Sequence, residues 1–171
     1  ITPPTAIAGP NGELTCTVTQ TQLNGAGSSS GANITYQWTT VNGNIVSGAT
    51  TLTPTVNACG TYTLKVTNTS NGCTATASTS VICNTAQPNA SATGGTITCA
   101  SPSVTLGGSS TTPGATFHWT GPGITPANQD QQNPTVEVSG VYTLTVTDPD
   151  NGCTKTATAS VAENIAPPTA V

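Results

Sequence analysis

The chain consists of one structural unit that occurs twice, and this internal repeat restricts its fold more than any other feature. The tetrapeptide Asn-Gly-Cys-Thr occurs at residues 71–74 and again 80 residues later, at residues 151–154. The pattern Gly-x-Tyr-Thr-Leu-x-Val-Thr occurs at residues 60–67 and again at residues 140–147. Self-similarity at a fixed spacing is typical of tandem arrays. We therefore expect two units of about 82 residues on a shared scaffold, with small loop insertions between them. Other positions that recur are Trp38 as Trp119, Tyr62 as Tyr142, and Cys16 as Cys99.

The two ends of the chain are related as well. Residues 3–7, Pro-Pro-Thr-Ala-Ile, reappear as Pro-Pro-Thr-Ala-Val at residues 167–171. The sequence therefore predicts a first repeat unit at residues 1–85, a second at residues 86–166, and the start of a further repeat at residues 167–171. On this interpretation the chain is a segment of a longer repetitive protein, so the lack of a signal peptide in it says nothing about export.

Composition excludes several classes of partner. Only 5% of the residues are charged, with two Lys, no Arg and six acidic residues, and the formal net charge is −4. Nucleic-acid binding requires a cluster of cations, which this chain lacks. No apolar run approaches the roughly 20 residues that span a bilayer, so we expect no direct membrane insertion. Thr, Ser, Asn and Gly dominate instead, which is the composition of strands and turns.

The hydrophobic pattern predicts an all-β fold. Tyr62, Leu64 and Val66 alternate with polar residues, as expected for a strand with one buried face. About seven short strands per unit, separated by turns, fit a two-sheet sandwich. The expected strands lie around Leu14 and Ile97, around residues 104–106, at residues 34–38 and 115–119, in segments that end at Val56 and Val138, and along a hairpin that returns to Val81 and Val161.

The six cysteines are expected to form disulfides, because small cores of this kind often need covalent cross-links. Cys99 and Cys153 are the only cysteines of the second unit, so their pairing is the simplest hypothesis, and Cys16 with Cys73 is the equivalent pair. Cys59 and Cys83 would then face each other at the open end of the hairpin whose turn is Asn71-Gly72. A zinc site is the weaker alternative, because no C-x-x-C pair exists and the chain has one His. Disulfides imply an oxidising, extracellular setting.

The repeat resembles a known group, the immunoglobulin-like and PKD-like repeats of very large secreted surface proteins of Bacteroidetes-type bacteria, including gliding-motility adhesins. The resemblance depends on Trp-Thr-Gly-Pro-Gly at residues 119–123, on the Gly-x-Tyr-Thr-Leu-x-Val-Thr pattern and on Asn-Gly-Cys-Thr. It implies two tandem immunoglobulin-like β-sandwiches. Antibody-type domains carry a cysteine two residues after the corresponding Tyr, whereas this chain has Leu64 and Leu144 there.

Several motifs have a functional and a structural interpretation, and the structural one is favoured for each. Residues 148–152, Asp-Pro-Asp-Asn-Gly, resemble a calcium loop, but the matching residues 68–72 contain no carboxylate, so a turn is expected. His118 is expected to be an exposed strand residue rather than a base, because no acid or Ser is linked to it by a motif. Trp38 and Trp119 recur at one position of the unit, so core residues are favoured over sugar-stacking platforms.

The outward strand faces carry mostly Thr. One explanation is that Thr is a neutral residue that favours strands, and the other is that its hydroxyl is an acceptor for O-linked glycan. We favour glycosylation because the chain has little charge to keep an extended surface soluble. The candidate glycosylation sites are Thr63, Thr67, Thr74, Thr76, Thr143, Thr147, Thr154, Thr156 and Thr158.

The sequence thus predicts a structural and adhesive repeat module of a long bacterial surface protein or fibre, secreted or at the cell surface, which gives reach and stiffness. We expect no enzymatic activity, no cofactor and no metal. The expected partners are neighbouring repeats of the same chain, lateral copies of the same protein, and attached or bound glycans. The Pro-containing junctions at residues 86–88 and 166–168 favour an extended arrangement of the units. The alternative is a carbohydrate-binding module attached to a secreted enzyme.

Overall fold

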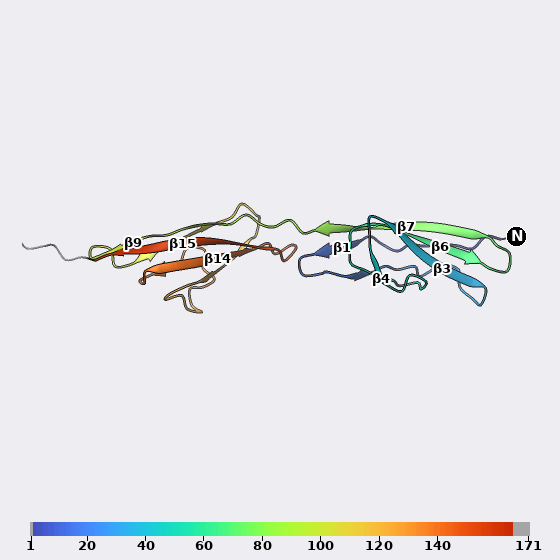
Figure 1. The fold of residues 1–171 in the computed structure, drawn as a ribbon, viewed down its shortest axis with the longest axis horizontal. Helices are drawn as coiled ribbons and strands as arrows, with labels where there is room; N and C mark the ends of the chain where they lie inside the picture. Colours follow the sequence, from blue (N-terminus) through green and yellow to red (C-terminus); the bar gives the residue numbers. More distant parts are fainter. Residues whose placement is uncertain (1, 166–171) are drawn as a thin grey trace, which may run out of the picture. The chain divides into compact units, whose positions relative to one another are not determined.

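The computed structural model describes residues 2–165, and the chain divides after Thr85 into two compact units. All regular elements in this range are strands (Figure 1). The predicted start of a further repeat at residues 167–171 lies outside the described residues.

Unit 1 contains two sheets that pack on one core. The larger sheet has four strands in the order β1-β7-β6-β3, and the smaller has three in the order β2-β5-β4. Strand β1 is parallel to β7, whereas the other pairs are antiparallel. The strands are β1 (Gly12–Thr15), β2 (Thr21–Gln22), β3 (Ile34–Val41), β4 (Ile45–Ser47), β5 (Thr55–Val56), β6 (Gly60–Asn68) and β7 (Thr74–Asn84).

Unit 2 repeats this arrangement. Its large sheet has the order β12-β14-β15-β9, with β9 parallel to β15, and two short strand pairs, β10 with β13 and β11 with β8, complete the unit. The strands are β8 (Ser91–Thr93), β9 (Gly95–Thr98), β10 (Val104–Thr105), β11 (Gly107–Ser109), β12 (Thr116–Thr120), β13 (Thr135–Val136), β14 (Gly140–Thr147) and β15 (Thr154–Asn164).

In each unit, every second residue of the central strands points inward and contributes to the core. In unit 1 the inward residues Tyr62, Leu64 and Val66 are fully buried and lie in one cluster with Trp38. The smaller sheet closes the cluster from the other side through Val56. The equivalent cluster of unit 2 contains Trp119, Tyr142, Leu144, Val146 and Val136. The predicted sandwich and its predicted core tryptophans are therefore present in both units.

One predicted strand position is wrong. The sequence places the end of the strand before the hairpin of unit 2 at Val138, but β13 ends at Val136. Val136 is the buried equivalent of Val56, whereas Val138 is 45% exposed. The error arose because both valines fit an alternating pattern, and only the packing shows which one enters the core.

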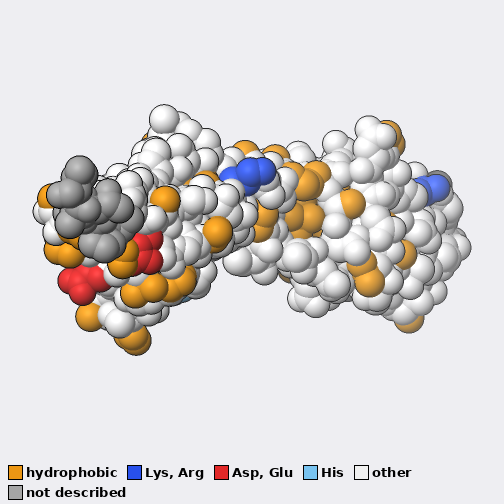
Figure 2. Space-filling view, turned by 60° about the vertical axis from the view of Figure 1, so that its left-hand side comes forward, with side chains coloured by type: hydrophobic (Ala, Val, Ile, Leu, Met, Phe, Trp, Pro, Cys, Tyr) orange, Lys and Arg blue, Asp and Glu red, His pale blue; other side chains and the backbone are white. Residues whose placement is uncertain are grey.

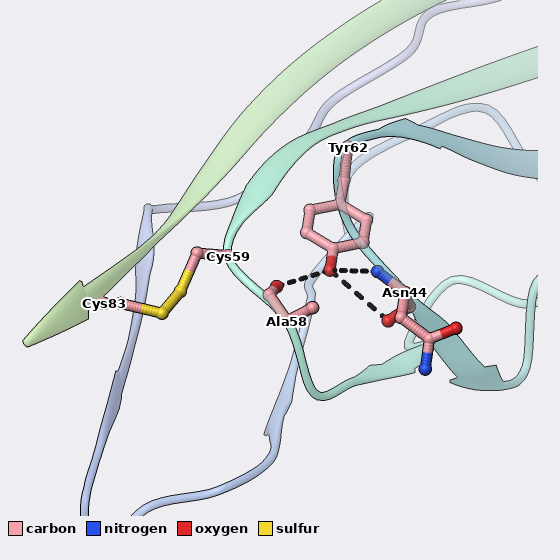
Figure 3. Close-up of a disulfide and its surroundings, with 5 residues drawn as sticks. All are labelled: Asn44, Ala58, Cys59, Tyr62 and Cys83. Atoms are coloured by element: carbon pink, nitrogen blue, oxygen red, sulfur yellow. Dashed lines mark hydrogen bonds between the residues drawn. A yellow bond between two sulfur atoms is a disulfide. The ribbon is translucent and has the colours of Figure 1, made fainter. Parts of the chain in front are cut away.

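The third residue of each hairpin is a tyrosine whose hydroxyl is hydrogen bonded to the backbone carbonyl four residues earlier. The hydroxyl of Tyr62 donates to the carbonyl of Ala58 (2.6 Å) and accepts from the backbone N–H of Asn44 (3.0 Å). The hydroxyl of Tyr142 donates to the carbonyl of Val138 (2.5 Å). Figure 3 shows the first of these corners beside the disulfide of unit 1. The arrangement matches the tyrosine corner of immunoglobulin-type sandwiches.

The chain enters and leaves each unit at opposite ends. The side chain of Asn71, in the β6–β7 turn, donates to the carbonyl of Thr2, so the chain enters unit 1 beside that turn (Figure 1). It leaves at Asn84, the other end of the 11-residue strand β7. In unit 2 the side chain of Asn151 donates to the carbonyl of Ala86, and β15 ends at Asn164. We call these ends the turn pole, at residues 69–73 and 149–153, and the exit pole, at residues 84 and 164.

Candidate functional surface

The outer face of each large sheet carries rows of hydroxyl side chains. In unit 1, Thr67 lies opposite Thr74 and Thr63 lies opposite Ser78. Paired residues share a face of a sheet, and these alternate with the buried residues of the core. In unit 2 the same face places Thr147 opposite Thr154, Thr145 opposite Thr156 and Thr143 opposite Thr158. The row of hydroxyl side chains is unbroken over these three pairs in unit 2, whereas in unit 1 Lys65, opposite Thr76, interrupts it.

The nine candidate threonines differ in accessibility. Those on the central strands β6 and β14 are half-buried, and Thr63 also shares a hydrogen bond of 2.9 Å with the hydroxyl of Ser78. Those on β7 and β15 are exposed. Attachment of a bulky group requires an accessible hydroxyl, and the second set alone has fully exposed side chains. The exposed set is Thr74, Thr76, Thr154, Thr156 and Thr158, and the half-buried set is Thr63, Thr67, Thr143 and Thr147.

The surface carries few charges. In Figure 2 most of the visible face consists of uncharged polar side chains and backbone, with small separate groups of basic and acidic atoms. Over residues 2–165 the structure contains no pocket and no group of three or more His, Cys, Asp or Glu side chains placed to hold a metal ion. The same range contains no helix that is long and apolar enough to cross a membrane.

His118 lies on the outer face of β12, 46% exposed, as the alternation with Phe117 and Trp119 predicts. Its Nδ1 donates to Oδ1 of Asp130 at 2.6 Å. This hydrogen bond is the main cause that holds the pKa of Asp130 below its ordinary value of 3.8. The pair was missed from the sequence because Asp130 follows 12 residues later in an irregular loop, where no periodic pattern indicates which side chains meet.

The tryptophans do not form a surface for sugar stacking. Trp38 and Trp119 are 1% and 0% exposed. Each indole N–H donates to a loop carbonyl, that of Thr51 in unit 1 and that of Gln132 in unit 2. Their prediction as core residues is confirmed, and their polar atoms are satisfied, as buried Trp requires.

Residues 148–152 form a turn that also exists in unit 1. The side chain of Asp148 accepts from the backbone N–H of Asp150, and that of Asn151 accepts from the N–H of Cys153. In unit 1 the side chains of Asn68 and Asn71 make the same two contacts. Because amide oxygens support the turn as well as carboxylates do, its geometry is explained without a cation.

Cys59 and Cys83 form the disulfide predicted from the symmetry of the hairpin, with a Cα–Cα distance of 5.7 Å (Figure 3). It joins the residue before β6 to the end of β7, and so closes the hairpin opposite its turn. The same end of the hairpin also carries the Tyr62 corner, so a covalent bond and a partly buried hydrogen bond fix it together.

The other two predicted cysteine pairs are wrong. Cys73 and Cys99 are free thiols, whereas Cys16 and Cys153 each belong to a disulfide. The register gives the reason. Thr15 lies opposite Asn84, so Cys16 is at the exit pole, while Cys73 precedes the first residue of β7 at the turn pole. A strand of 11 residues is about 36 Å long, far beyond the roughly 7 Å that a disulfide allows between Cα atoms.

The same geometry separates the cysteines of unit 2. Thr98 lies opposite Asn164, which places Cys99 at the exit pole, where its thiol lies 3.7 Å from the carbonyl of Ile165. Cys153 directly precedes β15, at the turn pole. The sequence does not reveal this, because a parallel pairing of the first and last strands is a long-range feature without a local pattern.

Comparison with known proteins identifies structural neighbours only. No protein-family model matches the sequence, and no curated protein matches it. A structure of three N-terminal domains of the bacteriophage RB49 Highly Immunogenic Outer Capsid protein aligns with a TM-score of 0.48 and 14% identity, over 94% of this chain and 59% of that one. Extracellular domains 3–5 of Drosophila OTK align with a TM-score of 0.42 and 15% identity, over 94% of this chain and 62% of that one.

The chain thus spans about three fifths of those two structures. Titin domains Z1Z2, solved in complex with telethonin, align over 98% of this chain and 100% of that one, with a TM-score of 0.37 and 17% identity. All three TM-scores are below 0.5, so the fold is assigned from the chain's own geometry. The described residues form two all-β units in tandem, each with a buried tryptophan and a tyrosine corner, as in immunoglobulin-like sandwiches.

Proposed function

We propose that this chain is a structural and adhesive repeat module of a long extracellular bacterial surface protein or fibre, without enzymatic activity, which supplies reach and resists tension. The observation that supports it best is the placement of entry and exit at opposite poles of each unit. Because the chain crosses the full length of β7 or β15 before it leaves, every unit adds about 36 Å along the load direction, the length of an 11-residue strand.

Strand pairing suits the same role. In unit 1 tension enters through β1 and leaves through β7, and these neighbours are parallel over four residue pairs, from Gly12 with Val81 to Thr15 with Asn84. Pulling the start of one parallel strand against the end of the other loads their hydrogen bonds together, in shear. In unit 2 β9 and β15 have the same relationship. Such a pair resists force better than a hairpin that opens one bond at a time.

Pulling experiments on unit 2 test this proposal. Under reducing conditions, handles at residues 86 and 165 load β9 against β15 in shear, whereas handles at residues 139 and 163 peel β14 from β15. Both geometries unfold the same unit, so the second is a matched control. The proposal predicts a clearly higher unfolding force for the first pair. Equal forces in the two geometries would refute a tension-bearing role.

O-linked glycan on the outer Thr rows is the second part of the proposal. It is supported by the exposure of Thr74, Thr76, Thr154, Thr156 and Thr158 and by the sparse surface charge. In protein isolated from its source, peptides from β7 and β15 should carry sugar mass in addition to their amino-acid mass. A host without the glycosylation machinery should give folded protein that associates more readily. If the native peptides from β7 and β15 have the mass of their amino acids alone, the outer threonines have a purely structural role.

The alternative, a carbohydrate-binding module attached to a secreted enzyme, has less support. Such a module needs exposed aromatic rings, and both tryptophans as well as Tyr62 and Tyr142 are buried. Sequence adjoining this segment in the full-length protein discriminates between the two functions. Further repeats of the same kind favour the surface fibre, and a hydrolase domain favours the binding module. The extended arrangement expected from the junction stays a prediction, which small-angle scattering from the whole chain tests.

A further inference from the structure

Strand β7 of unit 1 has a neighbouring strand on only one side over most of its length. On that side β6 pairs with it from Thr74 to Val81. On the other side β1 pairs only with its last four residues, from Val81 to Asn84 (Figure 1). Residues 74–80 therefore form a free border of the large sheet, which we call the open edge.

Every second residue of the open edge directs its backbone N–H and C=O away from β6. The N–H of Asn68 donates to the carbonyl of Cys73, directly before β7. Hydrogen-bonded pairs recur at every second position of an antiparallel ladder, so the odd-numbered residues of β7 bond to β6. The backbone groups that face outward therefore belong to Thr74, Thr76 and Ser78.

These outward groups have no partner in the described part of the chain. Across residues 2–165, no hydrogen bond joins the backbone N–H or C=O of Thr74, Thr76 or Ser78 to another segment. The side chains of all three residues are exposed. The next outward N–H, that of Ser80, donates to Oδ1 of Asn11 at 3.3 Å, so the row of free groups ends there. Such a row is a template for pairing with another strand.

The open edge lacks the features by which proteins keep sheet edges apart, namely charge, proline and bulges. Residues 74–80, Thr-Ala-Thr-Ala-Ser-Thr-Ser, are small and neutral, and their register with β6 is regular. Unit 2 differs at one position. There Lys155 occupies the place of Ala75, so the corresponding edge of β15 carries a positive charge. Pairing with a further strand is therefore favoured in unit 1.

We propose that the open edge binds the same edge of a second copy of the chain, in antiparallel pairing about a two-fold axis at Thr76. In this register Thr76 lies opposite Thr76 of the second copy, and Thr74 lies opposite Ser78 of the second copy. Residues in such pairs exchange both of their hydrogen bonds, so every free group of both copies is used. Any shift of the register leaves at least one of the three residues without a partner. The edge is thus complementary to itself, which identifies the occupant as a second copy.

The side chains do not obstruct this pairing. On the outer face the register brings Thr and Ser side chains together, and Thr–Thr pairs across strands are favourable. On the inner face Ala75 lies opposite Ala77 of the second copy, where methyl groups fit between paired strands. A glycan on Thr74 or Thr76 would cover the open edge, so modification there would prevent the pairing. The inference does not depend on the tension-bearing role, which a failure of the tests below leaves unaffected.

Sedimentation equilibrium over a range of concentrations tests the proposal with the whole chain from a host without glycosylation machinery. The background variant Cys73→Ser/Cys99→Ser removes the free thiols, so that no disulfide joins two chains through them. We expect a reversible equilibrium between monomer and dimer. A chain that stays monomeric up to its highest soluble concentration would overturn the proposal, whether or not a strand of another protein binds the edge.

Two proline variants at equivalent positions locate the interface. Thr76→Pro removes one N–H of the open edge from each copy without the loss of a bond to β6, and proline is tolerated where the N–H of an edge strand faces solvent. The dissociation constant of the dimer should therefore rise by about tenfold or more. Thr156→Pro makes the same change on β15 of unit 2 and should leave the constant unchanged. Equal effects of the two variants would contradict the proposal.

A charged variant provides a test that does not depend on proline. Ala75→Lys introduces the residue that unit 2 carries as Lys155 in the same fold, so the variant should fold. It should raise the dissociation constant, most strongly at low salt, because like charges meet at the interface. The charge-matched control is Thr39→Lys, an exposed position on the opposite edge strand β3, which should leave the constant unchanged. The same effect in both variants would show that the interface does not involve the open edge.

Amide hydrogen exchange, measured by NMR at low and high concentration, gives the most direct readout. The N–H groups of Thr74, Thr76 and Ser78 should become protected as the dimer forms, whereas that of Thr156 in unit 2 should not change. Protection that develops at other residues while these three amides stay unprotected would place the interface elsewhere and overturn the proposal.

Discussion

Ser139 donates a hydrogen bond of 3.2 Å to Glu163 at the place in unit 2 where Cys59 is bonded to Cys83 in unit 1. Both pairs lie at the open end of the hairpin, 80 residues apart in the sequence. The fold of the repeat therefore brings these two positions together whether the side chains form a disulfide, as in unit 1, or a hydrogen bond, as in unit 2. The geometry of the disulfide is a property of the repeat, and the bond itself is an addition to one copy.

The double variant Ser139→Cys/Glu163→Cys should form a disulfide in unit 2 without rearrangement of the backbone. Closing a loop of this length should raise the free energy of unfolding of unit 2 by about 3 kcal/mol on the chain-entropy model. Urea denaturation with and without reductant measures the gain. Each single variant is a control and should show the same dependence on reductant as the parent chain, which keeps its native disulfides. A double variant that stays reduced would show that the two sites are not equivalent.

Alkaline pH should destabilise unit 2 through Tyr142. Burial raises the pKa of its phenol above the ordinary value of 10.0, so the unfolded state ionises first as the pH rises. The neutral phenol thus contributes stability that is complete below about pH 10 and is lost as the pH rises towards the higher folded pKa. Urea midpoints measured between pH 9 and pH 11 should fall less steeply in Tyr142→Phe than in the parent chain. The same pH dependence in both chains would show that Tyr142 does not cause the loss of stability.

Asp130 should titrate at lower pH than an ordinary aspartate. Its hydrogen bond to His118 favours the carboxylate, so the contribution of the pair is present above pH 3.8 and is lost as the pH falls through the lower folded pKa. NMR titration of the side-chain carboxyl measures this directly. In His118→Ala the carboxyl pKa should return towards its ordinary value, and an unchanged pKa would assign the shift to another group. Because Asp130 is exposed, little change in stability is expected.

The central strand of each unit should tolerate change on one face only. Leu64 is fully buried between the two sheets, so Leu64→Ala should cost about 2–5 kcal/mol of the free energy of unfolding of unit 1. Lys65, the next residue, is exposed. Lys65→Ala is therefore a matched control, which should change stability by less than about 0.5 kcal/mol in the same urea titration. Similar costs at the two positions would contradict the assignment of the strand faces.

The sequence predicts local structure well here and long-range pairing poorly. The alternation at residues 60–67 correctly identifies a strand and its buried face, because the period of a strand is a local property. The symmetry of the hairpin correctly pairs Cys59 with Cys83 for the same reason. The position of Cys16, at the exit pole and far from Cys73, depends on the parallel register of β1 with β7, between segments about 70 residues apart. No local pattern encodes that register, and the contact of His118 with Asp130 was missed for a similar reason.

The most direct test of the account is the force that unfolds unit 1 when the reduced chain is pulled from handles at residues 2 and 85. Strands β1 and β7 are parallel and paired from Gly12 with Val81 to Thr15 with Asn84, so this geometry loads their hydrogen bonds in shear. The account predicts a clearly higher unfolding force than for handles at residues 59 and 83, which peel β6 from β7 in the same unit. Equal forces in the two geometries would contradict the account, because the entry and exit strands would then give the unit no resistance to tension.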